Sequence, residues 1–382
     1  MESDTTEPAG TAPDRHLIHL VAGNRWGGSR QYALDICSHY KARGWKVEAV
    51  TRDAKAVDDP FRRAGISLRH APLRGLTDPS TIATLVRMIR DIPVGAGVIH
   101  AHRYRDAFSA HIARKIAKRP DIRLVVTRHT LRPVRITHLL NSVYAATDAH
   151  IFVSRTARDR FLRAWEGKRK GCPVAPEKMH VLLNSIPGNF LDPTPVPAKG
   201  PVIALCCGAI TPGRGLETAI DALVSLRDLK LRLRIVGNGL PDYLDSLRRR
   251  AMVRGVMEMI DWRIAAEHPR ELLLDSHFGV QPSIEREAFG LDNLRFMALG
   301  RAQVCSPNGA QTEFLEDGVS ALFVPPADSD ALARAIRRLA TDPELRDTLA
   351  SNAFKIFSAG LDWDSFISRL DAIYGLPNLN NE

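Results

Sequence analysis

The sequence predicts an α/β fold in which two doubly wound domains are joined by a short linker. Short runs of apolar and β-branched residues alternate with segments of helical periodicity, which is typical of parallel α/β folds. The alternation stops at a proline-rich stretch and then restarts. A chain of 382 residues also exceeds the length at which single hydrophobic cores stop growing, so two domains are expected.

The first domain is expected at residues 15–190, after a disordered tail at 1–14. Apolar residues at three- and four-residue spacing in 82–89 predict one of its helices. Its predicted strands are 16–21, 46–51, 97–101, 123–127, 150–153 and 180–183.

The second domain is expected at 202–360, after the linker LDPTPVPAKGP at 191–201. Helical spacing recurs in 216–223 and in 332–339. Ligands of open α/β sheets bind at the carboxyl ends of the strands, so the loops there are the first place to look for a site. The predicted strands of this domain are 202–207, 232–236, 278–281, 302–306 and 321–324.

Composition excludes several classes of protein. No apolar run approaches the roughly 18 to 20 residues that a membrane-spanning helix needs, and the N-terminal segment lacks the basic start and apolar stretch of a signal peptide. The five cysteines form no CxxC pair, which argues against a disulfide framework and against a zinc site. A reducing cytoplasm is therefore the expected compartment.

The net charge of +10 is concentrated in one segment. Residues 103–170 contain 17 Lys or Arg against 5 Asp or Glu, while the rest of the chain is close to neutral. Such a segment is either a solvated face or a landing surface for an anionic membrane or a phosphorylated acceptor. Leu, Phe and Trp interleave with the charges in RFLRAWEGKRKG, as they do in interfacial segments.

Two loops that follow predicted strands contain the glycines and the charge that a phosphate site needs. Gly27 and Gly28 follow the first strand and precede a helix, where the backbone is open to a close approach by an anion, although a Gly-Gly pair is more often only a turn. The second domain repeats the arrangement at 208–215, which includes Arg214. A guanidinium in such a loop suits a diphosphate.

The stretch SIEREAFGLDNLRFMALGR at 283–301 gathers charge around a glycine turn. Glu285 and Glu287 precede the turn, and Asp292 and Arg295 lie on the first turns of the predicted helix that follows. Charge near a buried turn is unfavourable unless it is paired or functional, so this stretch is a candidate site.

Taken in order, these motifs resemble those of the retaining GT-B glycosyltransferases of family four, the bacterial glycosyl transferases group 1, over nearly the whole length. The resemblance implies two Rossmann-like domains facing across a cleft and a C-terminal helix at 361–377 that crosses back to the first domain. The motifs that carry it are Gly27-Gly28, VIHAH at 98–102, VVTRHT at 125–130, FVSRTARDRF at 152–161, HVLLNSIP at 180–187, GAITPGRG at 208–215, the 283–301 block and NGAQTEFLEDGVSALFVPPAD at 308–328.

The resemblance also implies a role for individual residues. Glu287 would accept hydrogen bonds from the donor sugar, His129 would touch that sugar near the reacting centre, and Arg214 would steady the leaving diphosphate. These roles suit a reaction that develops negative charge on the departing phosphates. The remaining donor-binding residues would be Gly27, Gly28, Gly208, Gly290, Leu291, Asp292 and Arg295.

The chain departs from the family pattern at two positions. Arg295 stands where the family has a second glutamate that grips the ribose, and Ala209 stands where it has an arginine of the phosphate loop. One hypothesis is that Arg295 makes up for the lost cation, by reaching the diphosphate or by pairing with Glu287 or Asp292. The alternative is a surface pair of Asp292 and Arg295 worth a few tenths of a kcal/mol.

No cofactor is expected, because the nucleotide-diphosphate sugar is a substrate. No required metal is expected either. The pairs Asp328/Asp330 and Asp362/Asp364 have the spacing of a metal motif, but each precedes a helical run and is better explained as a helix cap. His100 and His102 share a strand face without a clear third ligand, so packing at the strand end is the preferred interpretation.

The predicted function is therefore transfer of a sugar from a nucleotide donor to a hydroxyl of a glycan or lipid-linked acceptor, in cell-envelope polysaccharide or lipopolysaccharide synthesis. The protein would be cytoplasmic and peripheral on the inner face of the membrane. One alternative is an inactive protein of the same fold that only binds a nucleotide or sugar. A polyanion-binding protein is a weaker alternative, because no nucleic-acid motif is present and no nucleic-acid partner is expected.

Overall fold

A computed structural model describes residues 15–76, 78–188, 193, 195–197, 199–264 and 270–376. The predicted tail at 1–14, part of the predicted linker and the last residue, 377, of the predicted C-terminal helix lie outside the described residues. The chain divides into two compact units. The first comprises the chain up to residue 128 together with 135–151 and 167–180, and the second comprises 129–134, 152–166 and the chain from 181 onward. The domain boundaries proposed from the sequence stay predictions.

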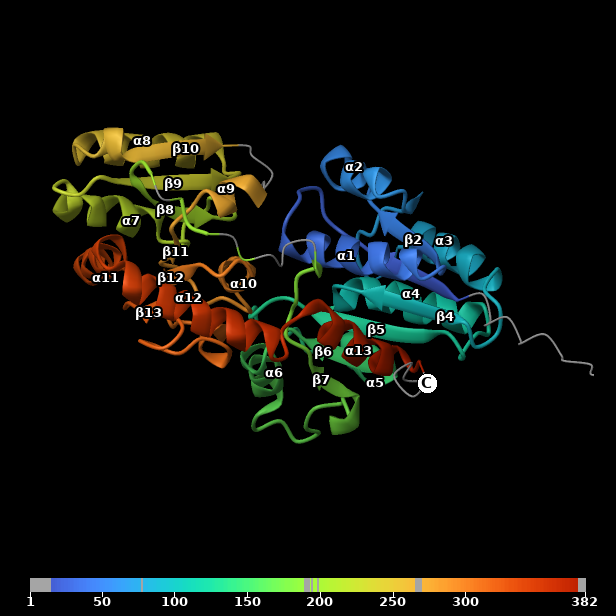
Figure 1. The fold of residues 1–382 in the computed structure, drawn as a ribbon. Coiled ribbons are helices and arrows are strands. Elements are labelled where there is room, and N and C mark those ends of the chain that lie inside the picture. The colour runs from blue at the N-terminus through green and yellow to red at the C-terminus, as the bar shows by residue number, and fades with distance from the viewer. Residues whose placement is uncertain are drawn as a thin grey trace, which may run out of the picture. The chain divides into compact units, whose positions relative to one another are not determined.

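The first unit is built on a seven-stranded sheet (Figure 1). Its strands are β1 His16–Leu20, β2 Lys46–Thr51, β3 Ser67–His70, β4 Gly97–Ala101, β5 Arg123–Arg128, β6 Ala149–Phe152 and β7 Met179–Val181. The helices of this unit are α1 Gly28–Ala42, α2 Lys55–Arg63, α3 Pro79–Arg90, α4 Tyr104–Ile116 and α5 His138–Ala146, whereas α6 Arg155–Leu162, which follows β6, belongs to the second unit.

The strand order of this sheet is β3-β2-β1-β4-β5-β6-β7, and β1 runs parallel to both β2 and β4. All five residues of β1 are buried, as expected for a central strand covered on both faces. The order reverses between β1 and β4, so the loops after these two strands leave the sheet at its switch point.

The second unit contains a six-stranded sheet in the order β10-β9-β8-β11-β12-β13. Its strands are β8 Val202–Cys207, β9 Leu231–Gly237, β10 Ile260–Ile264, β11 Phe278–Gln281, β12 Ala302–Cys305 and β13 Leu322–Phe323. Its helices are α7 Leu216–Ala222, α8 Pro241–Val253, α9 Arg270–Leu274, α10 Leu291–Ala298, α11 Ser329–Thr341, α12 Pro343–Ser358 and α13 Trp363–Tyr374.

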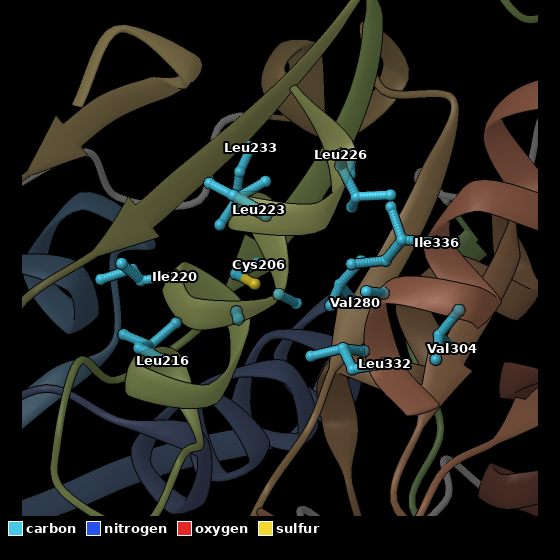
Figure 2. Packing of buried hydrophobic residues seen from close by; sticks show 14 of the residues in the cluster. Cys206, Leu216, Ile220, Leu223, Leu226, Leu233, Val280, Val304, Leu332 and Ile336 are labelled. Carbon is cyan, nitrogen blue, oxygen red and sulfur yellow. The ribbon is translucent and has the colours of Figure 1, made fainter. Parts of the chain in front are cut away.

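The core of the second unit lies on both faces of this sheet, because successive residues of a strand point to opposite sides. Cys206 of β8 belongs to the larger cluster, whereas Leu205 belongs to a smaller one with Phe296 of α10. The larger cluster contains Val280 of β11 together with Leu216 and Ile220 of α7 and Leu332 and Ile336 of α11 (Figure 2). The predicted doubly wound α/β class is confirmed for both units.

The sequence missed one edge strand in each sheet, β3 and β10. Three of the four residues of β3 are exposed, so no apolar run marks it. β10 reads IDWRI, an apolar–polar alternation that is typical of a half-buried strand but spans only five residues. Edge strands have one unpaired side and bury less apolar surface, so β3 lacks the apolar run on which its prediction would depend.

The predicted helix caps are present in the structure. The Asp328 side chain accepts from the Ala331 amide at the start of α11, and Asp362 accepts from the Ser365 amide at the start of α13. α13 buries Phe366, Ile367, Leu370 and Ile373 on one side, and its predicted crossing to the first domain stays a prediction. No described helix has the length and the apolar character needed to span a membrane.

Candidate functional site

The candidate site lies at the switch point of the second sheet, where β8 and β11 are neighbouring parallel strands. Their carboxyl ends lead into the 208–215 loop and the 282–290 loop. The side-chain Nε2 of Gln281, the last residue of β11, donates to the backbone carbonyl of Cys207, the last residue of β8, at 3.2 Å. This bond ties the two strand ends together, so the loops that follow start from fixed positions.

A pocket opens between these two strand ends. Residues of β8, β9 and β11 and of the 208–215 loop form its wall, and Arg214 is its charged member. The lining residues are Cys206, Cys207, Gly208, Ala209, Ile210, Arg214, Leu216, Ile235, Val236, Val280, Gln281 and Pro282. The hollow is small, about 10 Å³, and its wall is mostly apolar with one cation.

Four charged side chains form one network beside this pocket. Arg214 contacts the Glu287 carboxylate through its Nη1, and its Nη2 lies 3.6 Å from Oδ2 of Asp292. Arg295 donates from Nη1 to Oδ1 of Asp292 at 2.6 Å. Two guanidinium groups thus alternate with two carboxylates, and the sum of the four formal charges is zero.

The network is shielded from water. The exposed fractions of the side chains are 28% for Arg214, 14% for Glu287, 8% for Asp292 and 13% for Arg295. Burial alone would lower the pKa of the Arg214 guanidinium, but the nearby Glu287 and Asp292 carboxylates outweigh burial, and the pKa is raised above its usual value. Arg214 is therefore a permanent cation, held by attraction in a setting of reduced dielectric.

The structure tests the contacts that the two interpretations of Arg295 predict. The pairing with Asp292, which both interpretations include, is present. The alternative of a surface pair is wrong in its placement, because both side chains are largely buried. The partner of Glu287 is Arg214. Whether Arg295 serves the donor stays a prediction, and the geometry gives it the role of orienting Asp292.

Glu287 is held by several groups, two of which sequence analysis did not single out. The Ser283 hydroxyl donates to its Oε1, the same oxygen that Arg214 contacts. The side-chain Nδ2 of Asn308 donates to the backbone carbonyls of Ser283 and Ile284 at 2.7 and 2.9 Å, which fixes the start of the loop. Oε2 of Glu287 accepts no hydrogen bond from the described residues, so this oxygen remains open to a ligand hydroxyl.

Two of the predicted glycines are required by the backbone. Gly208 has φ +116°, and a Cβ there would lie 2.5 Å from Oδ2 of Asp292. Gly290 caps α10 at φ +100°, and a Cβ there would lie 2.7 Å from the Asn293 side chain. Leu291 is the first residue of α10 and is half-buried. The absence of a side chain at Gly208 lets the Asp292 carboxylate sit against the strand end.

The predicted glycine pair of the first unit differs from this pattern. Gly27 has φ 168°, an extended conformation open to any residue, and no atom lies within 4 Å of the position of a Cβ. Gly28 begins α1. The glycine that the backbone requires here is Gly23, at φ +118°, where the Arg30 guanidinium occupies the space of a side chain and donates to the Ala22 carbonyl at 2.7 Å. Open space at Gly27 is compatible with the predicted approach of a phosphate, which stays a prediction.

The predicted histidines lie at strand ends of the first sheet. His129 follows β5 directly and is half-buried, and its role toward the donor sugar stays a prediction. His100 Nε2 lies 2.7 Å from the Thr127 hydroxyl, and His102 Nε2 lies 3.1 Å from Nδ1 of the fully buried His19. Burial lowers the pKa of His19 to about 3, so this ring is neutral near pH 7. Packing at the strand end is thus what the structure shows for His100 and His102.

The structure removes one of the arguments that the basic segment 103–170 contacts a membrane. Phe161 and Trp165 are buried and pack on each other at 4.7 Å between ring centroids, so they are core residues and the interfacial interpretation of RFLRAWEGKRKG is wrong for them. The exposed apolar residues of the segment are Ile116, Ile136 and Leu139. The three consecutive basic residues 168–170 are exposed.

Comparison with protein families gives matches in both halves of the chain. The model described as Glycosyltransferase Family 4 matches residues 26–187, and the model described as Glycosyl transferases group 1 matches residues 191–356. The second match contains Arg214, Glu287, Asp292 and Arg295.

Similar proteins are spread over several activities. The D-inositol 3-phosphate glycosyltransferase of Nocardiopsis dassonvillei is 26% identical over 91% of this chain and 89% of its own length. The alpha-maltose-1-phosphate synthase of Mycobacterium tuberculosis is 27% identical over 65% of this chain and 70% of its own length. Among solved structures, Anabaena HepE in complex with UDP and glucose is similar with a TM-score of 0.79 at 20% identity, over 94% of this chain and 99% of that chain.

Substitution of Gly208 by alanine tests the contact with Asp292. A Cβ at φ +116° would be strained and would push the Asp292 carboxylate away, so Gly208→Ala should lower the free energy of unfolding by about 1–3 kcal/mol in urea unfolding. Gly27→Ala is the matched control, because it adds the same methyl group in open space, and it should lower the free energy by less than about 1 kcal/mol. Equal losses for both variants would contradict the described packing.

Removal of Arg295 tests its pairing with Asp292. Arg295→Ala leaves a buried carboxylate with one guanidinium partner fewer, so the free energy of unfolding should fall by about 1–3 kcal/mol. The exposed Arg337–Asp228 pair is the control, and Arg337→Ala should lower the free energy of unfolding clearly less than Arg295→Ala does.

The same Arg295→Ala variant separates stability from donor binding. If Arg295 orients Asp292 for the donor, the donor KM should rise about tenfold, which corresponds to about 1.4 kcal/mol. A stability loss with an unchanged donor KM would show that Arg295 is only structural.

Proposed function

Since the chain belongs to the family-four glycosyltransferases of the GT-B fold, we propose that it transfers a sugar from a nucleoside-diphosphate sugar to a hydroxyl with retention of configuration. The observation that carries the proposal is the Arg214 guanidinium, set between Glu287 and Asp292 beside a pocket at the switch point of the second sheet. This position offers a fixed cation next to an acceptor of hydroxyl hydrogen bonds, which are the two groups that a sugar phosphate requires.

Arg214 is the group that would meet the leaving diphosphate. Cleavage of the bond between the sugar and the phosphate leaves negative charge on the diphosphate, and a preplaced cation stabilises this charge without reorganisation. A guanidinium has five N–H donors in a planar fork, so it can bind phosphate oxygens and keep one carboxylate contact. We propose that Arg214 binds the oxygens of the leaving diphosphate.

Glu287 is the group that would bind the donor sugar. Arg214 and Ser283 both contact its Oε1, which holds the carboxylate in one orientation. Its Oε2 is then directed by these bonds and can accept from a sugar hydroxyl. His129 is proposed to touch the same sugar, and Gly27 and Gly28 to approach its phosphates.

The proposed reaction does not require a metal ion. Arg214 would supply the positive charge that a metal would otherwise bring to the diphosphate. Asp328 and Asp362, which belong to the two pairs with the spacing of a metal motif, cap helices instead. Addition of a chelator should therefore leave the transfer rate unchanged.

We propose a phosphorylated or lipid-linked acceptor that binds to the first unit. The relatives named for inositol phosphate and maltose phosphate support an acceptor that bears phosphate. The excess of basic residues in 103–170 would attract such an acceptor or the anionic face of a membrane. Cell-envelope polysaccharide or lipopolysaccharide synthesis at the cytoplasmic face of the membrane would use these substrates.

Arg214 variants test the proposed transfer directly. Release of nucleoside diphosphate from a panel of nucleotide sugars, with and without candidate acceptors, gives kcat and KM. Arg214→Ala should lower kcat/KM by at least about hundredfold, because a donor to the developing charge is lost. Arg214→Lys keeps the charge without the fork and should recover part of the loss.

One control variant and one contrary outcome make this result decisive. Arg232→Ala removes an exposed arginine of β9 in the same unit and should leave kcat/KM unchanged. A wild-type protein that binds nucleotide sugars but neither transfers nor hydrolyses them would instead support the inactive binding protein, which Ala209 and Arg295 favour.

Membrane association depends on a separate surface and has its own test. Lys168→Ser, Arg169→Ser and Lys170→Ser together remove three exposed positive charges, each worth about 1 kcal/mol near an anionic surface. The triple variant should bind vesicles containing phosphatidylserine at least about tenfold more weakly than the wild type, with unchanged donor KM. Equal vesicle binding by both proteins would exclude 168–170 from membrane association.

A further inference from the structure

A cluster of three potential metal ligands lies in the first unit, on consecutive elements of the chain. Asp53 is in the loop after β2, Asp58 is in the first turn of α2, and His70 is the last residue of β3. Because β2 and β3 run in parallel, with Thr51 paired to His70, the loop and the strand end meet at the same edge of the sheet.

The donor atoms of this cluster are close enough to share an ion. One ligand atom from each of the three residues lies within 4.8 Å of the other two. His70 Nε2 lies 2.9 Å from Oδ2 of Asp58, and His70 Nδ1 lies 3.7 Å from Oδ1 of Asp53. The 2.9 Å contact between Asp58 and His70 is of hydrogen-bond length, and Asp53 faces the other ring nitrogen, so binding of one ion requires the Asp53 carboxylate to rotate toward Asp58.

Asp58 is the feature that distinguishes this cluster from an ordinary surface pair. Its side chain is fully buried, and its Oδ1 finds no hydrogen-bond donor among the described residues. The nearest cation is Arg62, whose Nη2 lies 3.4 Å from Oδ2 and whose side chain is half exposed. A buried carboxylate with one oxygen unmatched is unfavourable, and a directly bound cation would offset this.

We propose that Asp53, Asp58 and His70 form a divalent cation site. Two carboxylate oxygens and one imidazole nitrogen suit Mn²⁺ and Zn²⁺ better than Mg²⁺ or Ca²⁺, because imidazole prefers the transition metals. Asp53 and His70 are largely exposed, with side-chain fractions of 74% and 40%, so Asp53 can rotate inward and water can fill the remaining positions. The ion would fasten the start of α2 to the end of β3.

This proposal is independent of the proposed function. All three residues belong to the first unit, whereas Arg214, Glu287 and Asp292 belong to the second. The ion is given no role in sugar transfer, so an inactive protein would leave the proposal intact.

Metal titration of the full chain tests the site. The protein is made without a polyhistidine tag, treated with a chelator and dialysed. Mn²⁺ binding is followed by loss of the free-ion electron paramagnetic resonance signal, and Zn²⁺ binding by calorimetry. The expected result is one equivalent of each ion, with each ion displacing the other.

Ligand variants locate the binding. Asp53→Asn and His70→Gln change exposed side chains and should fold, and each should weaken Mn²⁺ binding at least about tenfold. The controls are Asp59→Asn, next to the buried aspartate, and His138→Gln, an exposed histidine of the same unit, and both should bind as the wild type does. The proposal would be overturned if neither ion bound stoichiometrically, or if Asp53→Asn and His70→Gln bound Mn²⁺ as tightly as the wild type does. The Asp58–His70 contact would then only join α2 to β3.

Discussion

The contact of Arg214 with Glu287 and Asp292 is the interaction on which the candidate site depends. It joins the loop after β8 to the loop after β11 and to α10, so it sets the relative positions of the cation and of both carboxylates. Each charge is too buried to be left alone, since an uncompensated buried charge is strongly destabilising. The same pairing that stabilises the loops therefore keeps the functional groups at the pocket.

The balance of charge in this network also describes what the site would select. Two cations and two carboxylates leave no net attraction for an anion, so phosphate by itself gains little from the site. A ligand that brings hydroxyl groups along with phosphate can satisfy Glu287 and Arg214 together. A sugar diphosphate meets both requirements, whereas a simple polyanion meets one. The network thus favours a sugar-nucleotide site over a general anion site.

Much of this arrangement was visible in the sequence, and the rest was not for definable reasons. The central strands carry runs of buried residues, and β2, β4, β8 and β11 have the predicted bounds. The exposed edge strand β3 has no such run, and β10 alternates apolar and charged residues, a signal over only five positions. Arg214, Glu287 and Arg295 were identified from motifs, but the Arg214–Glu287 contact joins residues 73 positions apart, and no local spacing encodes it. The Asn308 side chain donates to backbone carbonyl groups, and every residue has such a group, so the sequence gives no signal of this contact. Phe161 and Trp165 show the opposite error, because proximity to basic residues does not reveal which face a ring occupies.

The most direct test is a crystal structure of the protein with a nucleoside-diphosphate sugar bound. The account predicts phosphate oxygens within about 3 Å of the Arg214 guanidinium and a sugar hydroxyl at a similar distance from Glu287 Oε2. A donor bound elsewhere, with Arg214 still held only by Glu287 and Asp292, would contradict it.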